Sequence, residues 1–226
     1  MSASLAACAE YLRARGLEAE IILADDGSAD GTGTAFADAL AELPQSHVAY
    51  HYLHLRHRGK GAAVRAGVRA ASGDPIIFLD SDLTIPVDII DDFMRAIASG
   101  ADIAIASRYV HGSVVRRPLW RRLVGDTFRV FVRTLVPTGV EDTQCGGKAY
   151  TAEAAKDLFA RQRLDGFAFD AEVLFLARRA QYRVREIPFA LVQDHETSID
   201  FLRETPRMIA DLFRIRLNAL LGRYRG

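Results

Sequence analysis

The sequence predicts an α/β fold in which a mostly parallel sheet is covered by helices on both faces. Two observations lead to this expectation. Short apolar runs alternate with longer segments of helical periodicity along most of the 226 residues. Half of the residues are apolar, which suits one domain with a sizeable core. We therefore expect a single domain over residues 1–226.

The expected strands are short, apolar and often β-branched, as strands buried on both faces are. In chain order they are residues 20–24, 48–55, 75–79, 102–106 and 184–189. In sheets of this kind, ligands bind beyond the carboxyl ends of the strands. Functional side chains should therefore lie where these strands end.

The expected helices have apolar residues spaced three and four apart. In chain order they are residues 4–15, 33–42, 62–71, 87–99, 152–161 and 168–179. Two further helices, 119–135 and 199–221, belong to a less regular C-terminal half.

Charge and cysteine content exclude several classes of protein. The 29 basic residues balance the 29 acidic ones, whereas a general nucleic-acid-binding protein would carry a basic surplus, so we expect no nucleic-acid partner. Two cysteines, Cys8 and Cys145, predict neither a disulfide framework nor a zinc site and favour a cytoplasmic setting. No apolar run reaches the roughly 18 residues of a membrane span, and the start lacks the features of a signal peptide.

The strongest motif follows the expected strand 75–79. Asp80 and Asp82 come directly after it, and at strand spacing both carboxylates would face one spot. Two carboxylates that close need a cation to neutralise them, and oxygen ligands suit Mg²⁺ or Mn²⁺. The alternative is a solvated acidic turn without a ligand.

Two other strand ends carry weaker signals. Asp25, Asp26 and Ser28 follow the strand 20–24, where they could contact a base and ribose or merely form an Asx turn and helix cap. The segment 58–61 opens the helix 62–71 with two glycines around Lys60. Such a turn could admit an anion to the helix N-terminus, with Lys60 on a phosphate, or be a plain loop.

Several motifs occur together in one order: DDGSADGT (25–32), the turn 58–61, GDPIIFLDSDLTIP (73–86), ASRYV (106–110), EDTQCGGKAY (141–150) and GFAFDAEVLFLARR (166–179). This order resembles the family 2 glycosyltransferases of the GT-A fold. Within that family the chain is similar to the polyprenyl-phosphate branch, which comprises dolichyl-phosphate mannose and glucose synthases. The resemblance extends over residues 20–224.

The resemblance implies a donor site for a nucleotide sugar, either UDP-glucose or GDP-mannose. Asp25, Asp26 and Ser28 would hold the base and ribose, and Lys60 would lie near the sugar nucleotide. Asp80 would also contact the donor through the metal ion.

The resemblance also implies catalytic and acceptor groups. Asp80 and Asp82 would be the DxD motif that binds Mg²⁺ or Mn²⁺, and Gln144 would lie near the transferred sugar. The acceptor would be a polyprenyl phosphate, bound by the basic residues Arg108, Arg117 and Arg121. Arg108 is therefore both a catalytic and an acceptor-binding candidate.

The chemistry is coherent in its own right. A lipid monophosphate has a second pKa of about 6 and is mostly dianionic at neutral pH, so it needs no general base. The sugar carbon becomes oxocarbenium-like as the nucleoside diphosphate leaves, and attack from the opposite face inverts the anomeric centre.

A membrane location is expected from two segments, 113–136 and 199–226, in which arginines are interleaved with aromatic and aliphatic residues. Such helices are typical of an anionic lipid surface, here the cytoplasmic face, although ordinary amphipathic helices packed on the core have the same pattern. The protein would be peripheral.

One departure from the family pattern affects the fold. Family members begin with a strand, whereas this chain starts at the following helix, so we expect the first strand of the sheet to be absent. Two alternative functions therefore stand beside hexose transfer to a lipid: transfer to a soluble acceptor, and nucleotide-sugar binding by a degenerate protein. Glucose is the favoured sugar and mannose the next, because DTQCGGK is closer to the glucose synthases.

Overall fold

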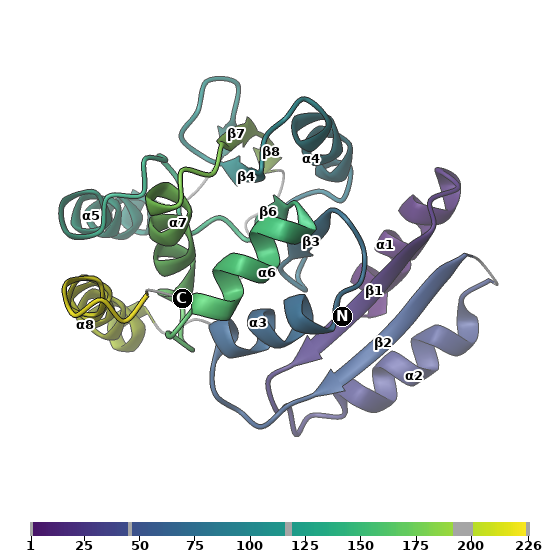
Figure 1. Ribbon diagram of the computed structural model, residues 1–226. Coiled ribbons are helices and arrows are strands. Elements are labelled where there is room, and N and C mark those ends of the chain that lie inside the picture. The colour runs from purple at the N-terminus through teal and green to yellow at the C-terminus, as the bar shows by residue number, and fades with distance from the viewer. Residues whose placement is uncertain (1, 45–46, 116–118, 192–200, 225–226) are drawn as a thin grey trace.

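A computed structural model describes residues 2–44, 47–115, 119–191 and 201–224 (Figure 1). Its helices are α1 (Ser2–Ala14), α2 (Thr32–Glu42), α3 (Lys60–Ala70), α4 (Ile89–Ala98), α5 (Leu119–Leu135), α6 (Ala152–Arg161), α7 (Phe169–Arg179) and α8 (Phe201–Leu220). Its strands are β1 (Ala19–Asp25), β2 (Val48–His54), β3 (Ile76–Leu79), β4 (Ile103–Ser107), β5 (Val114–Val115), β6 (Gly147–Tyr150), β7 (Val184–Pro188) and β8 (Ala190–Leu191). All eight predicted helices and all five predicted strands are confirmed to within a few residues.

The strands form three separate sheets. The central one has the order β3-β6-β4-β7, in which β4 and β7 are parallel while β6 is antiparallel to both of its neighbours. β1 pairs in parallel with β2, and β5 pairs in parallel with β8. The expectation of a mostly parallel sheet therefore missed β6. Among the described residues, β1 and β2 form a sheet of their own, apart from the central one.

Helices cover both faces of the central sheet. Alternate residues of β4 point to opposite faces and pack against different helices. Ile103 and Ile105 belong to a core shared with α5, α6, α7 and α8. Ala104 and Ala106 belong to a smaller core against α4, whose Phe93 is fully buried. α3 packs on β1, while α1 and α2 contact β2 (Figure 1).

Two helices lie side by side at one edge of the molecule. α5 and α8 contact one another, and their inner faces bury Phe128, Val132, Leu212 and Ile215 in the larger core (Figure 1). No helix of the described residues is long and apolar enough to cross a bilayer.

Candidate active site

The candidate metal-binding residues lie in a tight turn beyond β3. The Leu83 amide donates to the carbonyl of Asp80 at 3.0 Å, and Leu83 adopts a φ of 46°. The expectation of an extended strand through Asp82 was therefore wrong, because the chain folds back immediately after Asp80. The Asp82 side chain is exposed and accepts a hydrogen bond from the Thr84 amide at 3.0 Å.

Asp80 is held against the segment that leads into β6. Its amide donates to the carbonyl of Gly146 at 2.9 Å, and its carboxylate lies directly over the Gly146 α-carbon. A Cβ atom on Gly146 would stand 2.0 Å from Oδ2 of Asp80. Residue 146 must therefore lack a side chain if Asp80 is to keep this position.

Lys60 lies against the same turn. Its Nζ is 2.7 Å from Oδ1 of Asp80. Burial alone would lower the pKa of Lys60, but the carboxylates of Asp80, Asp170 and Asp82 outweigh it and raise that pKa. The structure thus brings together Lys60, Asp80 and Asp82, three residues that were predicted as site residues from two separate sequence motifs.

The turn before α3 packs closely against the segment 164–166. Its glycines make room for backbone: a Cβ on Gly59 would lie 2.6 Å from the carbonyl oxygen of Asp165, and one on Gly61 would lie 2.8 Å from that of Leu164. The Ala62 amide donates to the Asp165 carbonyl at 3.1 Å. These glycines therefore allow close contact with residues 164–166. Contact of Lys60 with a phosphate stays a prediction.

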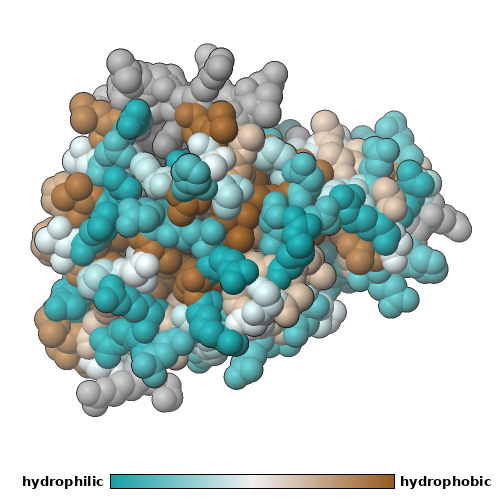
Figure 2. Space-filling model, turned by 90° about the horizontal axis from the view of Figure 1, so that it is seen from above, coloured by the Kyte–Doolittle hydropathy of each residue, from teal (hydrophilic) through white to brown (hydrophobic). Residues whose placement is uncertain are grey.

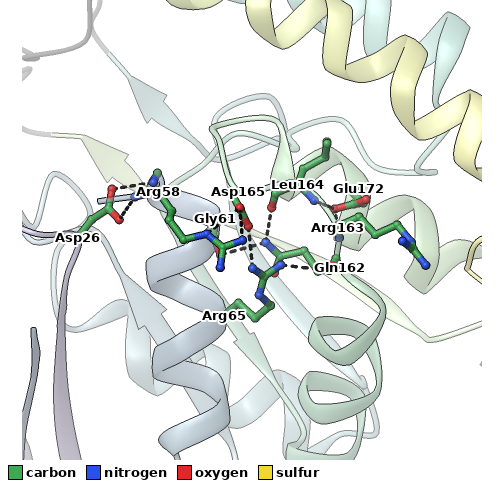
Figure 3. Close-up of polar contacts among 10 residues, drawn as sticks. Asp26, Arg58, Gly61, Arg65, Gln162, Arg163, Leu164, Asp165 and Glu172 are labelled. Atoms are coloured by element: carbon green, nitrogen blue, oxygen red, sulfur yellow. Dashed lines mark hydrogen bonds and ion pairs between the residues drawn. The ribbon is translucent and has the colours of Figure 1, made fainter. Parts of the chain in front are cut away.

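Asp165 stabilises this turn by pairing with two arginines. Its carboxylate accepts hydrogen bonds from Arg58 at 2.7 Å and from Arg65 at 2.6 Å (Figure 3). Asp26 holds the other side, where its two carboxylate oxygens accept the amides of Arg58 and Gly59 at 2.8 Å each (Figure 3). The backbone that carries Lys60 is thus fixed from two directions.

Asp25 is buried at the end of β1, in the segment predicted to bind the nucleotide. Its carboxylate accepts hydrogen bonds from the Ser28 amide at 2.9 Å and the Tyr52 hydroxyl at 2.5 Å, and lies 3.2 Å from Nδ1 of His54. Burial would raise the pKa of Asp25, but these hydrogen bonds outweigh it and hold the pKa well below its usual range. Contact of Asp25, Asp26 and Ser28 with a base or ribose stays a prediction.

Arg108 faces a carboxylate rather than open solvent. Its guanidinium forms a two-point contact with Asp142, with both nitrogen–oxygen distances at 2.7 Å. Burial would raise the pKa of Asp142, but the Arg108 charge outweighs it and lowers that pKa. Arg117 and the side chain of Arg121 lie outside the described residues, so their part in acceptor binding stays a prediction.

Gln144 follows the Asp142 turn. Its backbone amide donates to the Asp142 carboxylate at 3.2 Å. Its side-chain Nε2 is buried and has no hydrogen-bond partner within the described part of the chain. A buried amide left without a partner costs free energy, so its conformation is held by the surrounding packing. The position of Gln144 near the transferred sugar stays a prediction.

The donor set suits a small divalent cation. Mg²⁺ is commonly held by one or two carboxylates and completes its shell with water and substrate phosphates. Asp80 and Asp82 offer such a pair, and Lys60 already provides a positive charge at one of them. The described residues contain no group of three or more acidic, histidine or cysteine side chains that could hold a metal ion by themselves. Water and substrate phosphates would complete the coordination shell.

The residues that sequence reasoning missed are Asp165, Lys148 and Asp170. The last two lie in motifs that carried the family resemblance, yet their roles depend on contacts between distant segments. Lys148 is fully buried, and its Nζ is 2.6 Å from Oδ1 of Asp170. No local pattern distinguishes them from ordinary helix or strand residues.

The model of the family described as "Glycosyl transferase family 2" matches residues 2–159, which is more than half of the chain. The chain belongs to glycosyl transferase family 2. Among solved structures, this family member is similar to glucosyl-3-phosphoglycerate synthase from Mycobacterium tuberculosis in complex with phosphoglyceric acid. The TM-score is 0.67 at 20% identity, over 95% of this chain and 73% of the other. The fold is therefore the GT-A fold.

Curated relatives of this family 2 member are similar over most of its length. A dolichyl-phosphate beta-glucosyltransferase from Dictyostelium discoideum is 31% identical over 211 residues, which cover 90% of this chain and 64% of the relative. A polyprenol monophosphomannose synthase from Mycolicibacterium smegmatis is 33% identical over 183 residues, or 78% of this chain and 68% of the relative. The chain thus spans just under two thirds of the Dictyostelium protein.

Another solved structure of the mycobacterial glucosyl-3-phosphoglycerate synthase holds Mn²⁺, UDP and glucosyl-3-phosphoglycerate. It has a TM-score of 0.61 at 18% identity, over 90% of this chain and 68% of the other.

Proposed function

We propose that this family 2 member is an inverting, metal-dependent transferase that moves a hexose from a nucleotide diphosphate sugar to a polyprenyl phosphate. The observation that carries the proposal is the meeting of Lys60, Asp80 and Asp82 beyond the carboxyl end of β3. The names of relatives that act on dolichyl or polyprenyl phosphate support the choice of acceptor.

The chain's own residues would divide the work between donor and acceptor. Asp80 and Asp82 would hold a Mg²⁺ or Mn²⁺ ion, which stabilises the negative charge that forms on the leaving diphosphate. Lys60 would contact the same diphosphate from the start of α3. Gln144 would lie near the transferred sugar.

The acceptor would approach from the side of Arg108. A dianionic phosphate needs cations that place it rather than a base, and Arg108 would share its charge between that phosphate and Asp142. Arg117 and Arg121 would complete the acceptor site. The phosphate oxygen forms the new bond to the sugar carbon as the bond to the diphosphate breaks, so the anomeric configuration inverts.

We further propose UDP-glucose as the donor, with GDP-mannose next, because several of the curated relatives are named as glucosyltransferases. The site of action would be the cytoplasmic face of a membrane, where the chain binds peripherally.

Exposed apolar side chains on the helix pair α5–α8 support this location. The most exposed are Leu123, Val130, Phe213, Leu217 and Leu220, together with Leu221 directly after α8, each more than half exposed. The same helices carry exposed arginines, among them Arg122, Arg133 and Arg214. In Figure 2 apolar and polar groups alternate along the left margin, the side on which Figure 1 places this pair. Aliphatic groups among arginines suit an anionic lipid surface.

The test is transfer of labelled glucose from UDP-glucose to a short polyprenyl phosphate in the presence of Mn²⁺. We expect product that disappears with EDTA and falls by about 100-fold or more in Asp82→Ala, because the metal supplies several kcal/mol of transition-state stabilisation. Full-rate transfer in EDTA would contradict the metal role. Transfer to 3-phosphoglycerate but not to lipid would identify a soluble acceptor, and nucleotide binding without any transfer would identify a degenerate protein.

A further inference from the structure

A buried ion pair lies next to the candidate site and has no part in the proposed chemistry. Lys148 of β6 is fully buried, and its Nζ lies 2.6 Å from Oδ1 of Asp170 and 2.6 Å from the carbonyl oxygen of Cys145. The same ammonium stands 5.1 Å from the centre of the Phe78 ring on β3. Asp170 occupies the first turn of α7 and is 3% exposed.

Stability alone does not account for this pair. Taking two charges out of water is costly, and an apolar pair of similar volume is often as stable or more so. The surroundings of Lys148 on β6 are apolar, since Ala149 and Tyr150 are both buried in the core. Burial raises the pKa of Asp170 even with the lysine beside it, so the charged pair is held at some cost.

The two partners of Lys148 lead directly to the candidate metal-binding residue. Cys145 is followed by Gly146, whose carbonyl accepts the Asp80 amide at 2.9 Å and whose α-carbon lies under the Asp80 carboxylate. On the other side, the Asp170 carboxylate attracts the Lys60 ammonium and repels the Asp80 carboxylate. The ion pair thus links the segment that supports Asp80, through the Cys145 carbonyl, to the start of α7, where Asp170 attracts Lys60.

We propose that Lys148 and Asp170 are positioning residues for the donor–metal site. Lys148 fixes the Cys145 carbonyl and with it the Gly146 support on which Asp80 rests, while Asp170 keeps Lys60 directed toward Asp80. Neither residue touches substrate. The inference deepens the proposed function and rests on it.

The experiment replaces the pair without leaving one charge unpaired in the core. In Lys148→Met/Asp170→Leu both charges are removed together, so the chain should still fold cooperatively by circular dichroism. Mn²⁺ affinity, read from the free-ion signal in electron paramagnetic resonance, should fall by about 10- to 100-fold, as is usual when support of a metal ligand is lost. A second variant, Lys148→Gln/Asp170→Asn, keeps hydrogen bonding and should lose affinity as well, in case the apolar pair does not fold.

A core variant serves as the control for stability. Leu158→Ala opens a cavity in α6, where Leu158 is fully buried, and lowers the Tm without touching Asp80 or its support. It should bind Mn²⁺ as the wild type does at a temperature where both are folded. If the wild type binds Mn²⁺ and a folded neutral pair binds it equally well, the positioning role is wrong. If the wild type itself binds no Mn²⁺, the proposed function and this inference fall together.

Discussion

At the scale of single residues, the candidate site depends on close contacts that tolerate no added atoms. Gly146 is the clearest case, since the Asp80 carboxylate occupies the place of its missing side chain. The neighbouring groups are charged and partly exposed: the side chain of Asp80 is 36% exposed and that of Lys60 is 25% exposed. Solvent and ligands can therefore reach the carboxylate, while its backbone is fixed from behind.

Gly146→Ala should displace the Asp80 carboxylate, because the new Cβ would stand 2.0 Å from its Oδ2. We expect Mn²⁺ affinity and transfer to fall by about 10- to 100-fold in a folded protein. The matched control is Gly67→Ala in α3, where the nearest atom is 3.7 Å away and the change should stabilise the chain by about 0.5–1 kcal/mol. Wild-type Mn²⁺ binding by Gly146→Ala would show that this contact does not position Asp80.

Asp25 should contribute to stability at neutral pH. Its hydrogen bonds hold its pKa in the folded state below the unfolded value of about 3.9, so its contribution is fully present above that pH and is lost as the pH falls. Asp25→Asn should lower the free energy of unfolding at pH 7 by about 2 kcal/mol. Urea unfolding at pH 7 and pH 3 should show this difference shrinking in acid. An equal difference at both pH values would contradict the assignment.

At the scale of elements, sequence periodicity was sufficient for the helices and for the longer strands. β6 was missed because Gly147-Lys148-Ala149-Tyr150 has neither an apolar run nor regular alternation. Its lysine can be buried only because Asp170, 22 residues further on, is there to pair with it. The turn at Asp80 was also predicted incorrectly, because β3 ends at a contact with a distant segment. There the Asp80 amide donates to the carbonyl of Gly146.

The same limit applies to the candidate site. Lys60, Asp80 and Asp82 could be selected from the sequence because they end apolar strands or begin a helix with glycines. Asp165 could not, because its partners Arg58 and Arg65 belong to a distant helix start. Contacts of that kind are set by how elements pack and leave no local pattern.

Asp165→Asn should loosen the turn that carries Lys60, because both arginines lose their charged partner. We expect the KM for the nucleotide sugar to rise by about tenfold, with a small loss of stability of about 1 kcal/mol. Asp157→Asn is the control, since Asp157 also pairs with an arginine, Arg161, but on α6 away from the donor turn. A KM that moves equally in both variants would mean that the effect is not specific to this turn.

At the scale of the whole molecule, the proposed donor site and the helix pair α5–α8 are connected through hydrogen bonds. Arg163, next to the Asp165 loop, donates to the carbonyl of Arg223 at 2.7 Å, and the Tyr224 hydroxyl donates to buried Glu172 at 2.5 Å. The segment after α8 is thus anchored close to the loop that supports Lys60. A chain bound to lipid through α8 would hold its donor site at a fixed distance from the membrane.

Membrane binding should depend on the apolar outer face of α8. Leu217→Ser/Leu220→Ser removes two exposed leucines, each worth on the order of 1 kcal/mol if it enters lipid, so partition onto phosphatidylserine vesicles should weaken by about tenfold or more. Met94→Ser changes an exposed apolar residue on α4 and should float with vesicles as the wild type does. Unchanged flotation of the α8 variant would exclude this face as the lipid contact.

The central claim is that Asp80 and Asp82 bind a divalent cation together with a nucleoside diphosphate. Calorimetric titration of UDP into the wild type and Asp82→Ala, each with and without Mn²⁺, tests it most directly. We predict binding by the wild type that requires Mn²⁺ and is lost in Asp82→Ala, while the variant keeps the wild-type circular dichroism spectrum because Asp82 is exposed. UDP binding of equal strength without Mn²⁺, or in Asp82→Ala, would contradict the claim.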